Sequence, residues 1–292
     1  MAIILPANTL ATGGYEVANS CRFNHGDSAY LTRTFGSAGN QKTWTFSTWC
    51  KRSKFGAQQT LFGTSSGSAA YHLFYWGSDE TLTHNFNGTT TSASGKFRDP
   101  SAWYHVVCAV DTTQGVAANR VKLYVNGVSV GSGSYPSENA DMTLNSAARC
   151  DVGSSGAHYT SHMCGHYLAE TIFIDGTQYA ASDFGEFDSD SPTIWKPKDV
   201  SGLTFGTNGF YLDYEDSANL GNDANGGTDW TEVNLAATDQ MSDTPTNNWA
   251  TWNSAVYTDV VFSEGNTIAG HATAWGATAA TIALPNAGKW YY

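Results

Sequence analysis

The sequence has few charged residues and is especially poor in basic ones. Only 14% of its 292 residues are charged, and 14 Lys and Arg stand against 26 Asp and Glu, which gives a formal net charge of -12. Because phosphates and anionic lipids attract basic surfaces, nucleic acid and membrane are unfavoured partners. The first 14 residues contain a short apolar run without a basic flank, and no later segment is apolar over a membrane span. We expect neither a secretory signal nor an anchor, and a soluble protein made in a cytoplasm.

Cysteine is scarce as well. The five cysteines are scattered, they include no Cys-x-x-Cys pair, and their number is odd. Cys50 and Cys108 end or interrupt apolar segments, where a free thiol usually serves as a small buried hydrophobe. We predict free, buried thiols, with disulfides as the alternative.

Helix-length amphipathic segments are missing, and the best candidate is a single turn at 181–186. In their place the chain has 30 Gly, 14 Phe, 10 Trp and 15 Tyr, together with many Thr and Ser. This composition favours pleated strands and tight turns. The sequence therefore predicts an all-β protein, long enough to bury a core without disulfides.

Ten segments have strand patterning, and clusters of Gly, Asn, Asp and Ser separate them. In 120–126 apolar and polar residues alternate, and the segment stops at an Asn-Gly pair, a strong hairpin signal. Segment 103–111 is apolar nearly throughout, as expected for a central strand covered on both faces. Many short strands of this kind indicate a sandwich or barrel. The predicted strands are 20–24, 28–33, 43–51, 58–63, 71–76, 81–86, 103–111, 120–126, 165–174 and 209–214.

The texture of the chain changes after about residue 215. Segment 216–253 is polar, punctuated by aromatics and poor in aliphatic residues, and 254–292 returns to short β-like runs. The chain ends on three aromatics after a glycine turn, a pattern typical of the inside of a strand. We expect the native polypeptide to continue past Tyr292, or this end to be buried against a partner. The predicted divisions are an arm at 1–19, a sandwich at 20–215, a connector at 216–253 and a partial second β domain at 254–292.

Three long runs resemble a known family. WTFSTWCKRS (44–53), FRDPSAWYHVVCAVDTTQGVAANRVKLYVNG (97–127) and YLAETIFIDGTQYAASDFGE (167–186) resemble a laminin-G/concanavalin-A-like lectin domain. More narrowly they resemble the version found in tail-fibre and other structural proteins of bacteriophages, especially marine ones. The similarity covers about residues 1–253, and GKWYY near the end resembles the opening strand of SPRY-like domains that often follow in such proteins.

The resemblance implies two facing antiparallel sheets in a jelly roll, on a virion, with a role in structure or host attachment. We accordingly expect a non-enzymatic bacteriophage virion protein of the tail-fibre or adhesin type, with host-surface carbohydrate as a ligand. Its other expected partners are virion proteins and further copies of itself. The alternatives are a capsid or tail decoration or scaffold protein without glycan binding and, from another class, a β-glucanase-type depolymerase. A host-encoded lectin is a weaker alternative.

The stretch GEFDSDSP (185–192) is the candidate for catalysis. Retaining glycosidases use two carboxyls about 5–5.5 Å apart, and Glu186 and Asp188 alternate as such a pair would on a strand. Asp190, however, is shorter than the glutamate expected there, and turn-forming residues surround the stretch. We predict a solvated acidic loop at the end of the sandwich and no catalytic residues.

Two further stretches could bind metals. The stretch HYTSHMCGH contains His158, His162, Cys164 and His166, and the last three alternate and suit zinc. The alternative is that they are polar residues at the tip of a hairpin. The run after residue 212 offers hard oxygens suited to calcium, and many laminin-G and lectin sandwiches bind calcium. An Asx-turn-rich connector is the alternative for that run. The predicted calcium ligands are Asp213, Asp216, Asp223, Asn225 and Asp229.

Aromatic residues near a turn form the candidate glycan site. Tyr71, Tyr75 and Trp76 lie in YHLFYWGSDE (71–80), and aromatic faces stack on sugar rings. Aromatics at such positions are also common in a core. We take these three residues as the predicted glycan contacts.

Overall fold

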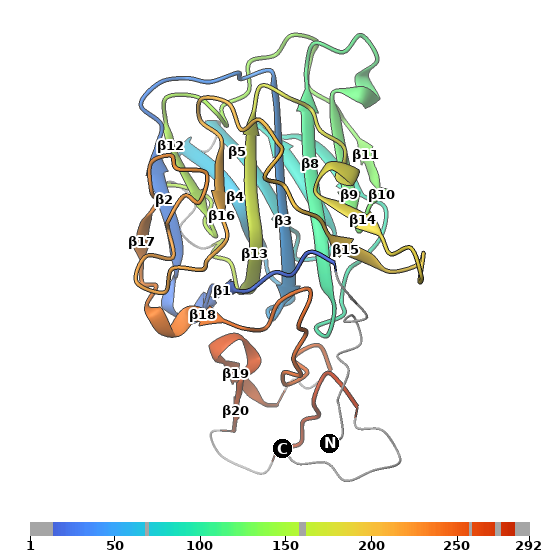
Figure 1. The fold of residues 1–292 in the computed structure, drawn as a ribbon, viewed down its shortest axis with the longest axis vertical. Coiled ribbons are helices and arrows are strands. Elements are labelled where there is room, and N and C mark those ends of the chain that lie inside the picture. Colours follow the sequence, from blue (N-terminus) through green and yellow to red (C-terminus); the bar gives the residue numbers. More distant parts are fainter. Residues whose placement is uncertain (1–13, 68–69, 158–161, 257–258, 272–275, 284–292) are drawn as a thin grey trace.

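The computed structural model describes residues 14–67, 70–157, 162–256, 259–271 and 276–283. These residues form two large antiparallel sheets that face each other, and two short hairpins lie outside them (Figure 1). The predicted all-β, two-sheet antiparallel sandwich is confirmed. Within the described ranges no helix is long and apolar enough to cross a membrane.

The first sheet contains the two longest strands, which pair with each other in its centre. Its order is β10, β9, β8, β3, β13, β1 and β18, and β16 also pairs with β13. The bounds are β1 Ser20–Arg22, β3 Thr43–Arg52, β8 Trp103–Asp111, β9 Val121–Val125, β10 Val128–Ser129, β13 His166–Asp175, β16 Phe210–Leu212 and β18 Gln240–Met241.

The second sheet has the order β11, β7, β6, β5, β4, β12, β2 and β17. Its bounds are β2 Tyr30–Thr34, β4 Gln59–Gly67, β5 Ala70–Trp76, β6 Leu82–Phe86, β7 Thr89–Ala93, β11 Gly131–Gly133, β12 Arg149–Val152 and β17 Thr231–Val233. All ten predicted strands are present, with ends shifted by a few residues. In this sheet the sequence patterns missed β7, β11, β12 and β17, which are short and mostly polar.

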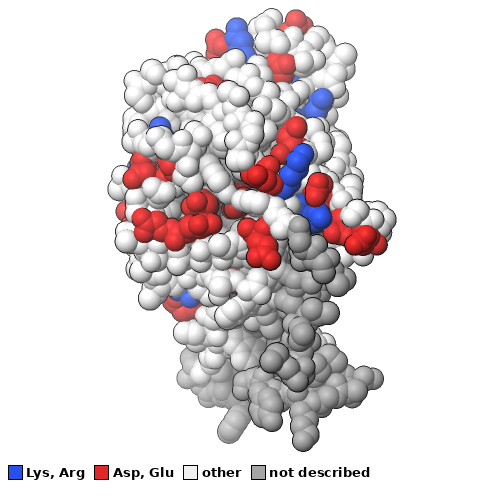
Figure 2. Space-filling view, viewed as in Figure 1, with Lys and Arg blue, Asp and Glu red and all other residues white. Residues whose placement is uncertain are grey.

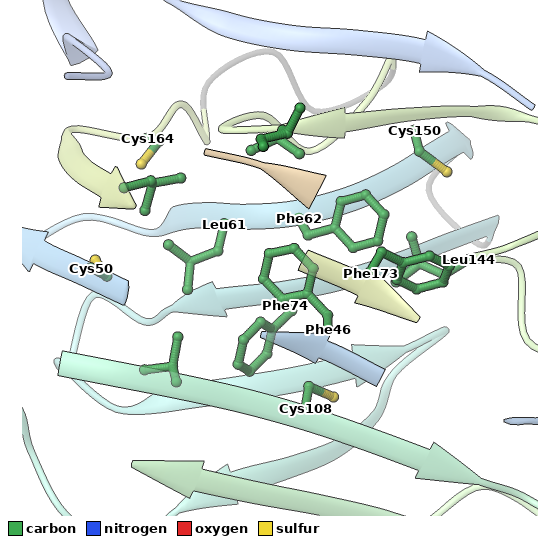
Figure 3. Close-up of a cluster of buried hydrophobic side chains, with 14 of the residues drawn as sticks. Phe46, Cys50, Leu61, Phe62, Phe74, Cys108, Leu144, Cys150, Cys164 and Phe173 are labelled. Atoms are coloured by element: carbon green, nitrogen blue, oxygen red, sulfur yellow. The ribbon is translucent and has the colours of Figure 1, made fainter. Parts of the chain in front are cut away.

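The main core lies between the sheets and is rich in phenylalanine (Figure 3). Phe46 of the first sheet stacks on Phe62 of the second with ring centroids 4.8 Å apart. All five cysteines are free and buried, as predicted, and four of them are seen in Figure 3. Burial raises the pKa of the Cys50 and Cys150 thiols to about 12, so these thiols are packing groups.

A second apolar cluster covers the outer face of the first sheet. Val107 and Ala109 of β8 point into it and meet Phe184 and Phe205 from the segment that follows β13. The other face of β8 contributes Cys108 to the main core. The prediction that 103–111 is covered on both faces is therefore confirmed.

The segment predicted as a connector packs against the sandwich. Its strand β17 pairs with β2, its strand β18 pairs with β1, and Trp230 is buried in the main core. The Lys51 ammonium forms a fully buried ion pair with Asp243, 2.7 Å away. The domain limits at 19, 215 and 253 stay predictions, but residues 216–248 share the core and sheets of the sandwich.

The last described part lies beyond one end of the sandwich (Figure 1). It contains a hairpin of β19 (Val261–Ser263) and β20 (Ile268–Gly270), joined by the turn Glu264–Asn266. An isolated two-stranded hairpin is marginal in water, and this one is attached through its turn to the sandwich. The Tyr167 hydroxyl donates a hydrogen bond to the Gly265 carbonyl at 2.8 Å.

Candidate functional site

The candidate site lies on the outer face of the second sheet, on β5. Side chains alternate along a strand, and His72, Phe74 and Trp76 all point into the core. Tyr71 and Tyr75 consequently point outward on the same face, and both are half-buried. Four positions of extended chain separate them by about 13 Å, so a ligand that touches both rings must be longer than one sugar.

Neighbouring strands surround these tyrosines with hydroxyl and amide groups. The register pairs Tyr75 with Thr83 and places Asn85 beside Leu73, so Thr83 and Asn85 share the outer face. On the next strand Ser92 pairs with Thr83, and their hydroxyls are 2.9 Å apart. Burial raises the pKa of the Tyr75 hydroxyl, which therefore stays protonated, able to donate and accept hydrogen bonds. We call Tyr71, Tyr75, Thr83, Asn85 and Ser92 the tyrosine face.

The loop after β12 forms a wall beside this face. Ser155 lies over β4, where its carbonyl accepts a hydrogen bond from the Ser65 hydroxyl at 2.5 Å. The Thr60 amide donates to the His162 carbonyl at 3.2 Å. The outer face of β4 is therefore covered by the loop, whereas β5 and its tyrosines remain partly accessible.

The structure separates Trp76 from the two tyrosines. Its side chain is 0% exposed, and the Arg52 guanidinium lies 4.7 Å from its ring centroid. The sequence interpretation grouped three aromatics that are close along the chain, but the strand period of two sends Trp76 to the opposite face. We therefore leave Trp76 out of the candidate site. Sequence reasoning missed Thr83, Asn85 and Ser92, because only the cross-strand register places them beside the tyrosines.

The predicted calcium ligands do not converge. The Asp223 carboxylate accepts hydrogen bonds from the Tyr211 and Asn225 amides at 3.0 and 3.1 Å. Asp229 in turn accepts from the Asp223 amide at 3.0 Å. The first two predicted ligands each cap a local turn: the Asp213 carboxylate accepts from the amide of residue 215, and the Asp216 carboxylate from that of residue 218.

In the described part of the chain, no group of three or more His, Cys, Asp or Glu could hold a metal ion. Three of the five predicted ligands, Asp213, Asp216 and Asp223, accept a hydrogen bond from the amide two residues later, which is the Asx-turn pattern of the alternative interpretation.

Two residues of the second metal candidate, Cys164 and His166, lie inside the fold. His158 lies outside the described residues. Cys164 and His166 are both fully buried, and burial raises the pKa of the thiol and lowers that of the imidazole. The His166 Nδ1 atom accepts a hydrogen bond from the Ser53 amide at 3.3 Å. Cys164 and His166 are therefore buried packing residues at the start of β13.

The acidic stretch 185–192 forms a hairpin on the outer side of the first sheet. Its strands β14 (Gly185–Phe187) and β15 (Trp195–Pro197) pair antiparallel. The Lys196 ammonium lies 3.5 Å from the Glu186 carboxylate and 3.2 Å from that of Asp188. This contact lowers the pKa of Asp188, whereas a glycosidase acid needs a raised pKa. The short strand corrects the expected loop, and Lys196 contacts both carboxylates of the predicted pair.

Two facing antiparallel sheets, with aromatic, hydroxyl and amide groups on one outer face, define a β-sandwich of the concanavalin A-like type. Residues 24–165 are similar to the family model described as the concanavalin A-like lectin/glucanases superfamily, of the laminin G type. No curated protein matches the sequence.

Several solved structures are similar to this chain at low sequence identity. One is a protein of Bacteroides ovatus described as a candidate carbohydrate-binding protein, with 14% identity over 75% of this chain and a TM-score of 0.52. This chain spans 58% of the length of that protein. Others are the SAP-like pentraxin of Limulus polyphemus (12% identity, 65% and 100% of the two chains, TM-score 0.45) and domains LG4-5 of the mouse laminin α1 chain (15% identity, 65% and 49%, TM-score 0.39).

Proposed function

We propose that this protein is a bacteriophage virion component of the tail-fibre or adhesin type that binds host-surface glycans through the tyrosine face. The observation that carries the glycan part is the placement of Tyr71 and Tyr75 on one accessible face beside Asn85. Aromatic rings stack on the apolar faces of sugars, and amide and hydroxyl groups pair with sugar hydroxyls. The virion part is supported by the resemblance of residues 1–253 to phage structural proteins.

Assembly with other copies or other virion proteins belongs to the same proposal. Five of the eight exposed large apolar side chains of the described residues lie between 249 and 268. Clustered exposed apolar residues on a soluble protein commonly mark an interaction surface. They are Trp249, Trp252, Val256, Val261 and Ile268.

Binding to a glycan array tests the glycan part. The variant carrying both Tyr71→Ala and Tyr75→Ala should bind about 5- to 150-fold more weakly, because two lost aromatic contacts amount to about 1–3 kcal/mol. Tyr30→Ala is the matched control, since Tyr30 is also half-buried on the outer face of this sheet but lies on β2. Equal binding by the double variant and the control would contradict the proposal.

Two alternatives make different predictions. If the protein is a decoration or scaffold protein, cryo-EM of the intact particle will find the tyrosine face covered by neighbouring subunits. If it is a glucanase-type depolymerase, it will release reducing sugars from β-glucans, and Glu186→Gln will abolish the release. We expect an accessible tyrosine face and no release.

A further inference from the structure

A polar cleft separates one end of the sandwich from the C-terminal hairpin. Two adjoining cavities, of about 280 and 430 Å³, share the lining residues Ser53, Lys54, Phe262 and Asn266. Together they have the volume of an ordinary small-ligand pocket, about 300–1,000 Å³. The wall on the sandwich side includes the turn 24–27 and Gly165, and the opposite wall is the turn Glu264–Asn266.

The turn that forms this second wall has an uncommon backbone. Glu264, Gly265 and Asn266 have φ values of +51°, +59° and +67°. A left-handed conformation costs about 1–2 kcal/mol for each residue other than glycine, and strain of this kind collects at functional sites. Contacts on both sides hold it: the Arg22 guanidinium lies 2.7 Å from the Glu264 carboxylate, and the Trp252 amide donates to the Asn266 carbonyl at 2.8 Å. The wall is therefore firmly positioned.

The cleft presents both hydrogen-bond acceptors and donors. The Asn24 side-chain amide donates to the Asp27 and Glu264 carboxylates at 2.7 and 3.0 Å, which links the two walls and leaves the second oxygen of the exposed Asp27 able to accept. Lys54 is exposed at the rim, and within the described residues its ammonium makes no ion pair. The half-buried ring of Phe262 adds an apolar surface.

Buried polar atoms without partners lie directly beside this cleft. The Gln59 side chain is 0% exposed, and among the described contacts neither its nitrogen nor its oxygen has a hydrogen-bond partner. Its Oε1 atom is 3.0 Å from the position that a Cβ on Gly165 would take, and Gly165 lines the cleft. The His166 Nε2 atom also lacks a partner. Unsatisfied buried polar groups are costly, and the Gln59 atoms lie directly behind Gly165 in the wall of the cleft.

We propose that this cleft is a second saccharide-binding site, selective for a neutral sugar. Carboxylates on both walls disfavour an anion, Lys54 disfavours a metal ion, and the polar walls disfavour an apolar ligand. A sugar ring satisfies all three conditions, since its hydroxyls donate to Asp27 and Glu264, accept from Lys54, and leave an apolar face for Phe262. The ligand class follows the proposed function, but the residues are different from those of the tyrosine face.

Amide chemical shifts of the ¹⁵N-labelled full chain distinguish the two sites. The probes are the methyl glycosides of glucose, galactose and N-acetylglucosamine, with methyl glucuronide as the anionic comparison. We expect at least one neutral glycoside to shift the amides of Lys54, Gly165 and Gly265. Lys54→Ala should weaken that binding about 3- to 10-fold, the effect of one lost hydrogen bond, whereas the matched charge change Lys198→Ala and the double variant of Tyr71 and Tyr75 should leave it unchanged.

Each other result overturns the cleft proposal in a recognisable way. Shifts confined to β5 and its neighbours would remove the second site and leave the proposed function standing. Shifts of the cleft amides with the glucuronide alone would show the wrong ligand class. Shifts at the cleft that Lys54→Ala and Lys198→Ala reduce equally would show that Lys54 does not act as a ligand contact. No shift at either site, together with a negative glycan array, would overturn both proposals.

Discussion

Acid should destabilise this protein through histidines sealed inside the sandwich. The buried histidines are His72, His84, His105 and His166, each 0% exposed. The Leu144 amide donates to His72 Nδ1 at 3.2 Å, so His72 carries its proton on Nε2 and donates it to His84 Nε2 at 2.6 Å. Burial lowers the pKa of His84 and of His105 to about 3 and lowers those of His72 and His166 well below the usual value.

The sign of the effect follows from which state binds protons. A histidine in the unfolded chain titrates near pH 6.5, whereas these histidines stay neutral in the folded protein until a much lower pH. Below pH 6.5 the unfolded state therefore binds more protons, and the stabilising contribution of the neutral histidines, present above pH 6.5, is lost as the pH falls. Between pH 7 and pH 5, His84 and His105 each remove about 2 kcal/mol from the free energy of unfolding. Their combined loss of about 4 kcal/mol is a large part of a typical 5–15 kcal/mol, and His72 and His166 act in the same direction.

Buried carboxyl groups oppose this loss of stability, chiefly Glu170. Burial raises the pKa of Glu170 to about 7, and its carboxylate accepts hydrogen bonds from Tyr15 at 3.0 Å and Tyr211 at 2.8 Å. A raised carboxyl pKa favours the folded state on acidification, so Glu170 returns about 2 kcal/mol over the same interval. The pKa values of Asp223 and Asp243 are also raised by burial and act in the same sense.

Urea unfolding at pH 7, 6 and 5 measures the balance, because the difference between pH values cancels any pH-independent cost of a substitution. His84→Gln should shrink the loss between pH 7 and 5 by about 2 kcal/mol, and Glu170→Gln should enlarge it by about 2 kcal/mol. His25→Gln, which changes a half-buried histidine outside the core, is the control. If the two variants do not move the pH dependence in opposite directions, the reasoning is wrong.

Three further predictions follow from buried contacts. Asp243→Asn should lower the free energy of unfolding by about 3–5 kcal/mol, because it leaves the Lys51 ammonium buried without its counter-charge. The control is Asp141→Asn, in the exposed pair with Lys42, which should change that free energy by less than about 1 kcal/mol in the same urea titration. Gly206→Ala should lower the melting temperature, since φ is +78° and a Cβ would lie 2.2 Å from the Asp175 carbonyl oxygen, whereas Gly202→Ala, which meets nothing within 4 Å, should not. The five buried cysteines should react with a thiol reagent such as DTNB only after unfolding, and rapid reaction of the native protein would contradict their burial.

Local patterns predicted ten of the twenty strands in the described residues. The alternation in 121–125 appears as alternating burial along β9, and the continuous apolar run 103–111 is the doubly covered strand β8. Both predictions succeeded because side-chain period and burial are properties of the strand itself. Strand β17 and the buried Trp230 were missed, because a polar segment gives no sign of pairing with β2 about 200 residues earlier.

The candidate sites depended on more than local pattern. The sequence contains Tyr71, Tyr75 and Trp76 in one short run, but which of them face outward depends on the first sheet, which covers the other side of β5. The carboxylates after residue 212 resemble calcium ligands in the sequence. In the folded protein those of Asp213, Asp216 and Asp223 accept hydrogen bonds from backbone amides. A side chain can bind a ligand only if it is accessible and is not already hydrogen-bonded within the fold. Tertiary packing decides both conditions.

Composition and strand period alone determined that this chain is acidic and all-β, with a sandwich or barrel architecture, because these properties are summed over short stretches. The tertiary structure decided which aromatics are accessible, that the segment after 215 shares the core, and that a cleft joins residues near 24, 54, 165 and 264. Such contacts join segments as much as 240 residues apart, as between Asn24 and Glu264. Contacts of this range come from the closure of the whole fold, and no short stretch of sequence encodes them.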